Sequence, residues 1–251
     1  MVNLYSMNQL SKYPWLRWYV SNLKSIPGGT YRFGFTDFPA LPPFRVSISP
    51  FRMGATPVTW GMWKEFCKAK SVRMPKDPGW GFPDDHPVVN VSWEDIMKPG
   101  GFCEWVSDVA GFKLTLPTSA QFEYSARGGK DGLEYPWGKD FDRSKLWCSD
   151  KQRNDAGKTA AVDRTSRIYR NGYGLTDTVG NVNQWCSDYH TEHEPPTGND
   201  PVDTTKSDYR GIRSGSWSSY DPINFRCASR NGFFPDAGLN IFGLRLSAGQ
   251  K

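Results

Sequence analysis

The chain has 251 residues, of which 15% are aromatic, and its 25 glycines and 19 prolines interrupt nearly every segment. This composition predicts a loop-rich globular protein with an aromatic core, and a mean hydropathy of −0.62 without a long apolar run excludes a membrane-spanning helix. The formal charge of +5 is scattered without a basic block, so nucleic-acid binding is not indicated.

Residues 1–25 are predicted to form an N-terminal leader with a helix around Trp15 to Leu23. They lack the charged start and apolar core of a signal peptide. The chain is therefore either cytosolic or a mature region whose targeting segment was removed. No linker or low-complexity tract divides residues 26–251, which we expect to form a single domain. Within it, residues 44–49 alternate apolar and polar side chains and predict a half-buried strand.

Three helices are predicted from their start signals. Thr59 can cap a helix that runs to about residue 69. Capping boxes at Ser92–Asp95 and Thr118–Gln121 begin two further helices. The Pro-Gly-Gly sequence at 99–101 should interrupt the second helix, and two glycines at 128–129 should end the third. The remainder reads as turns and short strands, so we predict an α+β fold with low regular secondary structure.

The cysteines do not indicate a zinc site, because no two of them form a Cys-x-x-Cys motif and their spacings are wide. Cys67 and Cys103 lie beside phenylalanines in helix-like stretches and are predicted to be buried small hydrophobes. The odd number leaves room for one disulfide. His190 and His193, each next to a glutamate, could ligate a metal, but Pro195-Pro196 indicates a solvated loop. We therefore predict neither a metal nor another cofactor.

The last forty residues combine a frame of glycines, arginines and one tryptophan with apolar filling. The C-terminal frame comprises Arg213–Trp217, Arg226–Arg230, Pro235–Asp236 and Gly243–Leu246. The filling includes Tyr220, Ile223, Phe225, Phe233, Phe234, Leu239, Ile241 and Phe242. Gly and Pro residues between them rule out one amphipathic helix, so short strands and loops are expected. Apolar loop side chains fit either a contact surface or a buried loop cluster.

Eight motifs follow one another along residues 26–247: Ile26–Thr30, Thr56–Thr59, His86–Trp93, Leu116–Thr118, Glu123–Gly129, Tyr135–Gly138, Gly174–Trp185, and Gly215–Trp217 through Gly243–Arg245. In this order they resemble the formylglycine-generating-enzyme (sulfatase-modifying factor) superfamily. The resemblance implies a C-type-lectin-like fold of the formylglycine-generating-enzyme type. It does not settle function, since the superfamily contains enzymes and binding proteins.

The resemblance also implies where catalytic cysteines would lie. The enzymes are similar to one another in a cysteine pair just after the Gly-Ser-aromatic motif, and that pair handles copper and oxygen chemistry. In this chain the first position is Ser219 and the second falls near Asn224. A serine hydroxyl is neither a soft metal ligand nor a redox group, so we predict that the chain is not an enzyme. Cys227, inside the frame, is interpreted as structural.

Two other metal-dependent properties of the superfamily are not predicted. A branch that resembles ergothioneine-type sulfoxide synthases holds iron largely through an additional helical domain, for which this chain has no room. Family calcium sites resemble the Gly-Asn-x-x-Glu-Trp turn, and here Gln184 replaces the carboxylate, which weakens such a site. We expect Asn181 to satisfy backbone groups within the turn instead.

The C-terminal frame is most similar to the variable region of proteins diversified by retroelements, as in Treponema-type variable proteins. Frame residues that match are Ser216–Trp217, Arg226, Ala228, Arg230, Pro235–Asp236, Gly243 and Arg245, within a variable region of about 213–246. The resemblance implies that side chains between them vary and form a ligand-binding patch. The predicted variable positions are Ser218, Ser219, Tyr220, Asp221, Ile223, Asn224, Asn231, Gly232, Phe233, Phe234, Ala237, Leu239, Asn240 and Ile241. Tyr220, Phe233 and Phe234 are the expected energetic anchors.

The resulting hypothesis is a non-catalytic, receptor-like or adhesin-like protein. Its expected partner is a protein on another cell or host surface, and its expected location is the cell surface, with a lipid anchor in the unprocessed form. Two alternatives remain at this stage. One is a metal- or oxygen-dependent oxidase of the same superfamily, and the other is a catalytically dead structural scaffold.

Overall fold

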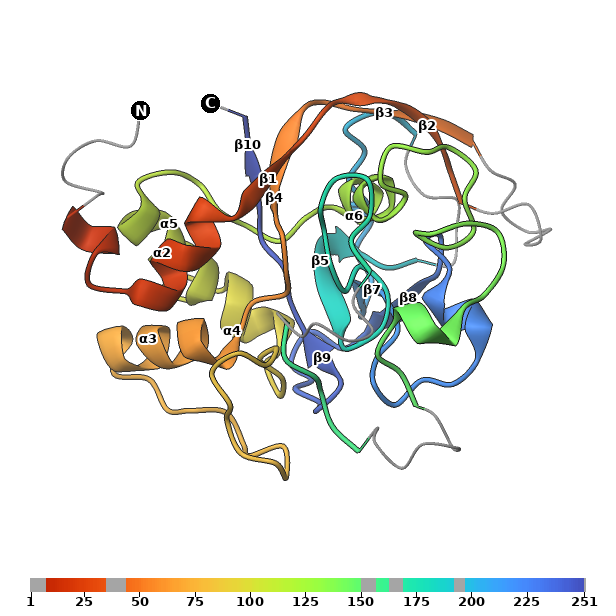
Figure 1. Cartoon of the computed structure of the whole chain (residues 1–251). Coiled ribbons are helices and arrows are strands. Elements are labelled where there is room, and N and C mark those ends of the chain that lie inside the picture. The colour runs from red at the N-terminus through yellow and green to blue at the C-terminus, as the bar shows by residue number, and fades with distance from the viewer. Residues whose placement is uncertain (1–7, 35–43, 150–156, 163–168, 192–196, 251) are drawn as a thin grey trace.

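The computed structural model describes residues 8–34, 44–149, 157–162, 169–191 and 197–250 of the chain. Its longer helices gather on one side and most strands on the other (Figure 1). The helices are α2 (Pro14–Ser21), α3 (Trp60–Lys70), α4 (Trp93–Met97), α5 (Phe102–Ala110) and α6 (Ser119–Ala126), with 3-10 turns η1 (Arg143–Lys145) and η2 (Pro222–Phe225). None of the helices in these ranges has the length and apolar character that a membrane crossing requires.

Ten short strands form three sheets in the described residues. The first has the order β1-β4-β10 (Leu23–Ile26, Phe51–Gly54, Ser247–Gly249), and the second has the order β2-β3-β6 (Gly29–Phe33, Phe44–Ile48, Gly198–Asn199). The third has the order β8-β7-β5-β9 (Arg230–Phe233, Arg210–Arg213, Asn183–Tyr189, Phe242–Gly243). The third sheet therefore takes two of its strands, and the end of another, from the predicted variable region.

The local start signals are correct for two of the three helices. Asp95 donates its backbone N–H to Ser92 Oγ at 3.0 Å, and Gln121 donates to Thr118 Oγ1 at 3.0 Å. Both capping boxes are reciprocal, as predicted. Thr59 precedes α3, but its side chain makes no cap hydrogen bond. Its hydroxyl is instead buried, which corrects the predicted role of this side chain.

The N-terminal segment packs into the body of the domain. Leu16 and Tyr19 on α2 are buried in the main core, and Leu246 donates its N–H to Tyr19 Oη at 2.9 Å. Glu65 of α3 accepts the N–H groups of Trp15 and Leu16 at the start of α2, at 2.9 and 3.0 Å. Residues 8–25, which the sequence predicted as a leader, thus share the core of the domain.

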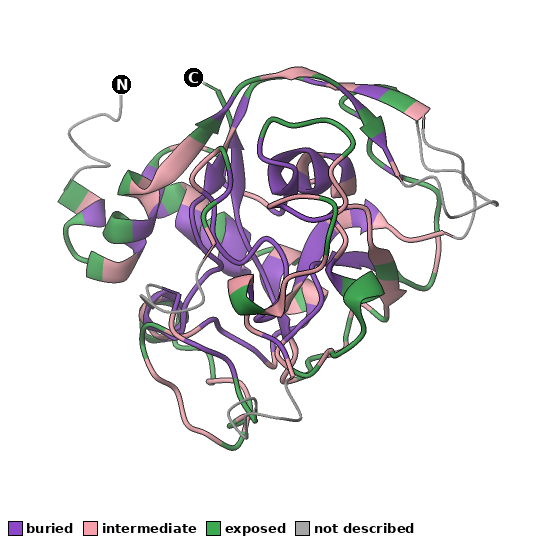
Figure 2. Cartoon of the chain, turned by 45° about the vertical axis from the view of Figure 1, so that its right-hand side comes forward, coloured by how far each residue is buried: buried purple, intermediate pink, exposed green. Residues whose placement is uncertain are grey.

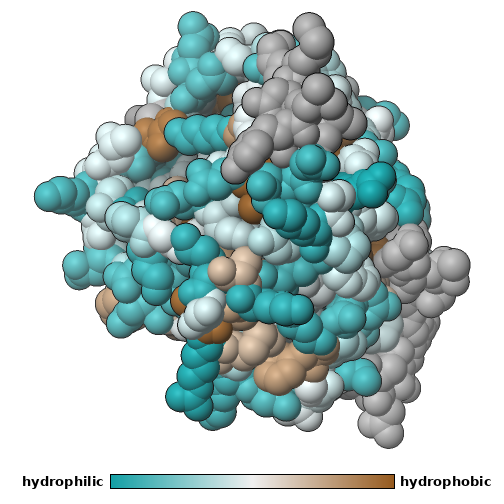
Figure 3. Space-filling model, turned by 90° about the vertical axis from the view of Figure 1, so that its left-hand side faces the viewer, coloured by the Kyte–Doolittle hydropathy of each residue, from teal (hydrophilic) through white to brown (hydrophobic). Residues whose placement is uncertain are grey.

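The core is aromatic and lies on both sides of the third sheet. On the helical side, Trp63 of α3 stacks on Phe102 of α5 with ring centroids 4.7 Å apart. On the other side, α6 buries Phe122 and Tyr124 against β2 and β3. The buried colouring of α6 and of the central strands shows that these elements fill the middle of the molecule (Figure 2). By contrast, the helical face of the surface is mostly hydrophilic (Figure 3).

Candidate functional site

The C-terminal frame is anchored by buried backbone and buried arginines. Residues 211–216 and 242–248 are all buried. Gly215 has a φ of +70°, and a Cβ there would lie 2.9 Å from the Phe225 ring. Only glycine fits such a position without strain. The frame therefore passes through the interior at both ends of the predicted variable region.

Arg245 joins four separated parts of the chain. Its guanidinium is fully buried and donates to Gln184 Oε1 at 3.0 Å, to Gly54 O at 2.7 Å and to Asp177 O at 3.1 Å, with a further bond to Thr176 O. Burial lowers the pKa of Arg245 to about 10. Gln184, at the position of the family carboxylate, is thus an acceptor for a buried cation.

The neighbouring turn is held by amide side chains. Asn181 accepts the N–H of Ala160 and donates to its carbonyl, both at 3.0 Å, and it also donates to Asp177 Oδ2. Asn181 therefore satisfies backbone groups, as predicted, but they belong to residue 160 and lie outside the turn. Gln184 donates to the carbonyl of Asp177 at 2.8 Å, so the side-chain amides of both Asn181 and Gln184 are hydrogen-bonded to other groups of the protein.

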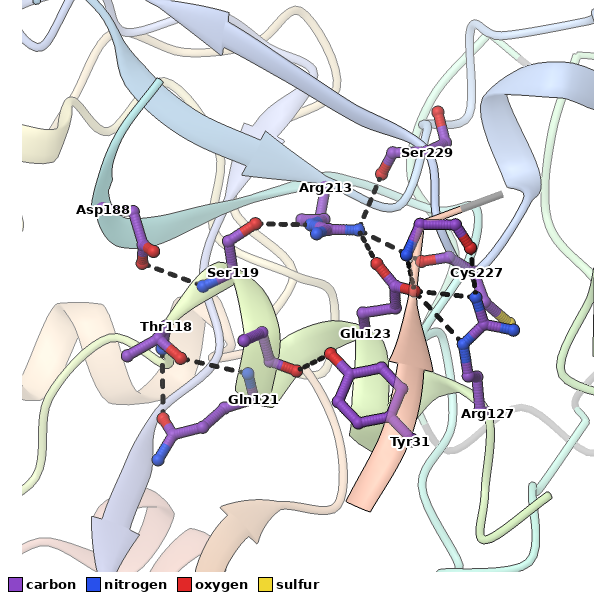
Figure 4. Close-up of polar contacts among 12 residues, drawn as sticks. Tyr31, Thr118, Ser119, Gln121, Glu123, Arg127, Asp188, Arg213, Cys227 and Ser229 are labelled. Carbon is purple, nitrogen blue, oxygen red and sulfur yellow. Dashed lines mark hydrogen bonds and ion pairs between the residues drawn. The ribbon is translucent and has the colours of Figure 1, made fainter. Parts of the chain in front are cut away.

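Arg213 at the end of β7 is held by α6 (Figure 4). Its Nη1 lies 3.1 Å from Glu123 Oε2, and its Nε donates to Ser119 Oγ at 2.9 Å. The other Glu123 oxygen lies 2.7 Å from Arg127 Nη2. All three charged side chains are at most 3% exposed. The capping box that starts α6 therefore also orients Ser119 and Glu123 toward the C-terminal frame.

A cavity of about 740 Å³ opens beside this network. Its wall combines aromatic and aliphatic side chains with arginines, and it comes from segments that are far apart in the sequence. The lining residues are Phe33, Gly34, Phe44, Asn183, His190, Thr191, Ile212, Arg213, Ser214, Gly215, Ser219, Ile223, Asn224, Arg226, Ala228, Ser229, Arg230, Asn231, Phe233, Ile241 and Phe242. A volume of this size suits a small molecule or a short peptide segment.

None of the fourteen predicted variable positions is buried. Six of them line the cavity: Ser219, Ile223, Asn224, Asn231, Phe233 and Ile241. The other eight lie outside the cavity wall: Ser218, Tyr220, Asp221, Gly232, Phe234, Ala237, Leu239 and Asn240. The structure thus brings one group of these positions around a single opening and leaves the rest on the surrounding surface.

The three expected anchors have different environments. Tyr220 and Phe234 are 65% and 49% exposed. Phe233 is half-buried and packs against Phe242, with ring centroids 4.9 Å apart. Phe234 also contacts Tyr209, which the sequence did not single out, at 4.8 Å between centroids. Tyr209 precedes β7, and no local signal connects it with residue 234.

Two aromatic residues of the apolar filling that are not among the predicted variable positions are core residues, which is the buried alternative left open for the filling. Phe225 is fully buried and stacks on Phe141, with ring centroids 5.8 Å apart. Phe242 is 2% exposed and packs against Trp185. Both follow positions that face outward, and the sequence carries no periodicity in this region to separate the two kinds of position.

This difference predicts unequal effects of alanine substitutions. Phe225→Ala is expected to lower the free energy of unfolding by about 3–5 kcal/mol, because it opens a cavity in the core. Phe234→Ala is expected to lower it by about 1 kcal/mol or less, because half of the ring is already exposed. Urea denaturation of both variants measures the difference. Equal destabilisation would show that Phe234 is not a surface residue.

The five cysteines are free and buried, and none of them lines the cavity within the described residues. Burial raises the pKa of Cys103 and of Cys227 to about 12, and that of Cys67 to about 11. These thiols stay protonated at neutral pH, whereas metal ligation requires the thiolate. The open question of one disulfide is settled by five separate thiols.

The raised thiol pKa values predict a loss of stability at alkaline pH. A thiol whose pKa is higher in the folded state contributes stability below its unfolded value of 9, and this is lost as pH rises through about 12. The Cys103→Ala, Cys227→Ala double variant should therefore lose stability less steeply than the wild type. Urea denaturation from about pH 8 to about pH 10 measures both slopes. Identical slopes would contradict the assignment of this stability loss to ionisation of Cys103 and Cys227.

The histidine candidates for a metal site divide between described and undescribed residues. His190 lines the cavity, while His193 and the two neighbouring glutamates lie outside the described residues. In the part of the chain that the structure describes, no three His, Cys, Asp or Glu side chains gather closely enough to hold a metal ion. The His190–His193 candidate, which the sequence did not favour as a metal site, therefore lies partly outside the described residues.

Comparison with known proteins identifies relatives over most of the chain. A family model described as sulfatase-modifying factor enzyme 1-like domain matches residues 19–248. Formylglycine-generating enzyme of Thermomonospora curvata is 28% identical, covering 89% of this chain and 92% of its own length. Inactive C-alpha-formylglycine-generating enzyme 2 of Bos taurus is 26% identical, covering 91% and 88%.

Among solved structures, Treponema denticola variable protein 1 superposes with a TM-score of 0.75 and 22% identity, covering 91% of this chain and 95% of that one. At this identity the likeness concerns the fold. It confirms the predicted α+β, C-type-lectin-like fold of the formylglycine-generating-enzyme type, with modest helical content.

Proposed function

The chain belongs to the family of sulfatase-modifying factor enzyme 1-like domains, and we propose that within this family it is a non-catalytic binding protein with a diversified C-terminal patch. The observation that carries the proposal is that the two ends of the C-terminal frame are buried while the predicted variable positions between them are not. Residues 211–216 and 242–248 are buried, whereas every predicted variable position between them is exposed or half-buried. Substitutions at such positions change stability little, so this surface tolerates diversification.

The surroundings of the cavity support a binding role over oxidase chemistry. Ser219 and Asn224, which occupy the places of the superfamily's cysteine pair, both line the cavity. The nearest frame cysteine, Cys227, is 2% exposed and its raised pKa keeps it protonated. A cavity with hydroxyl and amide groups at these two positions can bind and orient a ligand, but it offers no thiolate for copper.

The similarity to a protein named variable protein 1 is consistent with diversification. Under this proposal, the ligand is a protein on another cell or on a host, and the chain acts at the cell surface. Aromatic side chains at exposed loop positions supply contact area with little loss of conformational entropy, as in antibody loops. Tyr220 and Phe234 are the exposed candidates for this role.

Sequencing the C-terminal segment in sibling isolates tests the proposal. Differences should gather at the fourteen variable positions and spare the frame, and a reverse-transcriptase gene with a template repeat should lie nearby. Differences spread evenly over frame and filling would count against diversification. The positions of Phe225 and Phe242 serve as internal controls, since both are apolar filling but buried, and they should stay apolar.

The names of the curated relatives favour a second candidate, an oxygen-dependent oxidase. Copper content separates the two functions. Purified protein that has been incubated with copper and dialysed is expected to retain far less than one equivalent, because the described residues around the cavity include no cysteine. Elemental analysis measures the retained metal. Stoichiometric copper or iron would favour the oxidase.

A further inference from the structure

The wall of the cavity carries charge of one sign. Arg213, Arg226 and Arg230 line it together with His190, and no aspartate or glutamate stands among its described lining residues. Polar groups buried in a cavity interact more strongly than they do in water, because the surrounding dielectric constant is lower. Two of these arginines have carboxylate partners outside the lining, Glu123 for Arg213 and Glu134 for Arg226. Arg230 is half-buried at the wall, so the lining is suited to a ligand that brings negative charge.

Two of these arginines are directly opposite each other in the third sheet. Strands β7 and β8 pair antiparallel, and their register places Arg213 across from Arg230. Residues that are directly opposite project on the same face of a sheet, and like charges in such a pair repel. Burial lowers the pKa of Arg230 and the charge of Arg213 lowers it further, while the carboxylates of Glu123, Asp203 and Asp188 oppose this shift without cancelling it. The repulsion within the pair diminishes when an anion lies between or beside the two groups.

The carboxylate of Glu123 is shared between two arginines. Glu123 contacts Arg213 with one oxygen and Arg127 with the other. Arg213 also donates through Nη1 to the carbonyls of Cys227 and Ser229. Its Nη2 is buried without a hydrogen-bond partner. One carboxylate thus serves two buried arginines, and Arg213 supplies positive charge from behind the cavity wall rather than an accessible donor.

Apolar side chains form another part of the wall, beside polar ones such as Asn183 and Ser214. Phe33 and Phe44, from β2 and β3, face the same cavity as Phe233 of β8. Ile223 and Ile241, both predicted variable positions, also line it. The cavity therefore offers an apolar surface next to a cationic one, with both frame side chains and predicted variable positions in its wall.

We infer that the cavity receives a segment of the protein ligand that presents a carboxylate beside an apolar side chain, with the carboxylate at the half-buried Arg230, next to the buried charge of Arg213. This inference rests on the proposed binding function and names the chemistry of its ligand. The frame arginines would supply a constant attraction for the anion. The variable positions around them would select the neighbouring side chains. The carboxylate can be a chain terminus or an acidic side chain.

Two pairs of small probes distinguish these sources of the carboxylate. The first pair is N-acetyl-phenylalanine and its neutral amide, and the second is N-acetyl-aspartyl-phenylalanine amide and its asparaginyl counterpart. Titrations of the whole chain by NMR give the dissociation constants. In at least one pair the acid is expected to bind about tenfold or more tightly than its neutral partner, as one charge-assisted hydrogen bond allows. If neither acid exceeds its neutral partner, or no probe binds, the inference is overturned.

Charge substitutions at one rim position provide a matched test. Ile223 is 40% exposed, so both Ile223→Lys and Ile223→Asp should fold. Both lose the same apolar side chain, but the lysine variant should bind the acid probe about tenfold or more tightly than the aspartate variant. The neutral probe should not distinguish them. Equal binding of the acid by the two variants would contradict an anion site.

Arg230→Gln should remove the preference for the acid probe, and Arg17→Gln on the exposed face of α2 should leave it unchanged. If Arg230→Gln does not fold, the comparison of Ile223→Lys with Ile223→Asp still tests the anion site. Failure of the carboxylate inference can be distinguished from failure of the proposed binding function. If sibling sequences vary only in the filling but the acid and neutral probes bind equally well, the proposed binding patch stands. Only the inference that the ligand presents a carboxylate is then overturned.

Discussion

Glu123→Gln is expected to lower the free energy of unfolding by about 3–5 kcal/mol, because it leaves two buried arginines without their common carboxylate. Glu123 is fully buried, and its oxygens lie 2.7 Å from Arg127 Nη2 and 3.1 Å from Arg213 Nη1. The glutamine amide can accept through one oxygen only, carries no charge, and places an NH2 donor where the second acceptor oxygen was. The cluster would therefore keep its shape and lose its electrostatic balance.

Urea denaturation monitored by tryptophan fluorescence measures this effect, and Asp84→Asn is the matched control. Asp84 pairs with Lys64 at 2.6 Å, but both side chains are more than 40% exposed. Its loss is expected to change the free energy of unfolding by about 1 kcal/mol or less. If Glu123→Gln were as mild as this control, the buried cluster would not support the frame. The variant should also disturb the cavity, since Arg213 lines its wall.

Arg245→Met is expected to lower the free energy of unfolding by about 4 kcal/mol or more, because each buried acceptor left without a donor costs about 1–3 kcal/mol. Arg245 donates to Gln184 Oε1 and to the carbonyls of Gly54, Thr176 and Asp177. Methionine has a similar length but no donor. The effect reaches the frame directly, since residue 245 belongs to its last segment.

Thermal and urea denaturation again give the measurement, and Arg17→Met is the control at an exposed position. Burial of the charge itself opposes folding, as the lowered pKa of Arg245 shows. In the window between about 10 and its ordinary value of 12.5, the unfolded state binds more protons, so the contribution of this group to stability rises with pH. A variant as stable as the wild type would mean that the hydrogen bonds only offset the cost of burying the charge.

Helix-capping signals in the sequence predicted a helix start correctly where both capping partners lie within a few residues of each other. The capping boxes at Ser92 and Thr118 place two helices correctly, since both partners lie within one turn. Thr59 shows the limit of the same reasoning. It precedes α3 as expected, but its backbone pairs with Pro87 and its hydroxyl turns inward. The contact that decides its orientation comes from another part of the chain.

The order of the C-terminal frame singled out fourteen positions, none of which is buried. The two ends of the frame are buried, but its middle, including Arg226, Arg230 and Asp236, is half-buried or exposed. Among the aromatic filling, the frame order placed Phe234 among the variable positions and left out Phe225 and Phe242, and these two are buried while Phe234 is exposed. The loop segment itself has no periodicity from which to infer this difference.

By itself, the sequence determined the family, the fold and the absence of a cysteine pair at residues 219 and 224, since motif order and residue identity are properties of the chain. Only the tertiary structure decided that Phe33 and Phe44 share a cavity with the C-terminal frame, and that Arg213 lies opposite Arg230. Sheet register and α6 packing bring these residues together across more than a hundred positions. Such long-range contacts arise from the packing of the whole core, which no local pattern encodes.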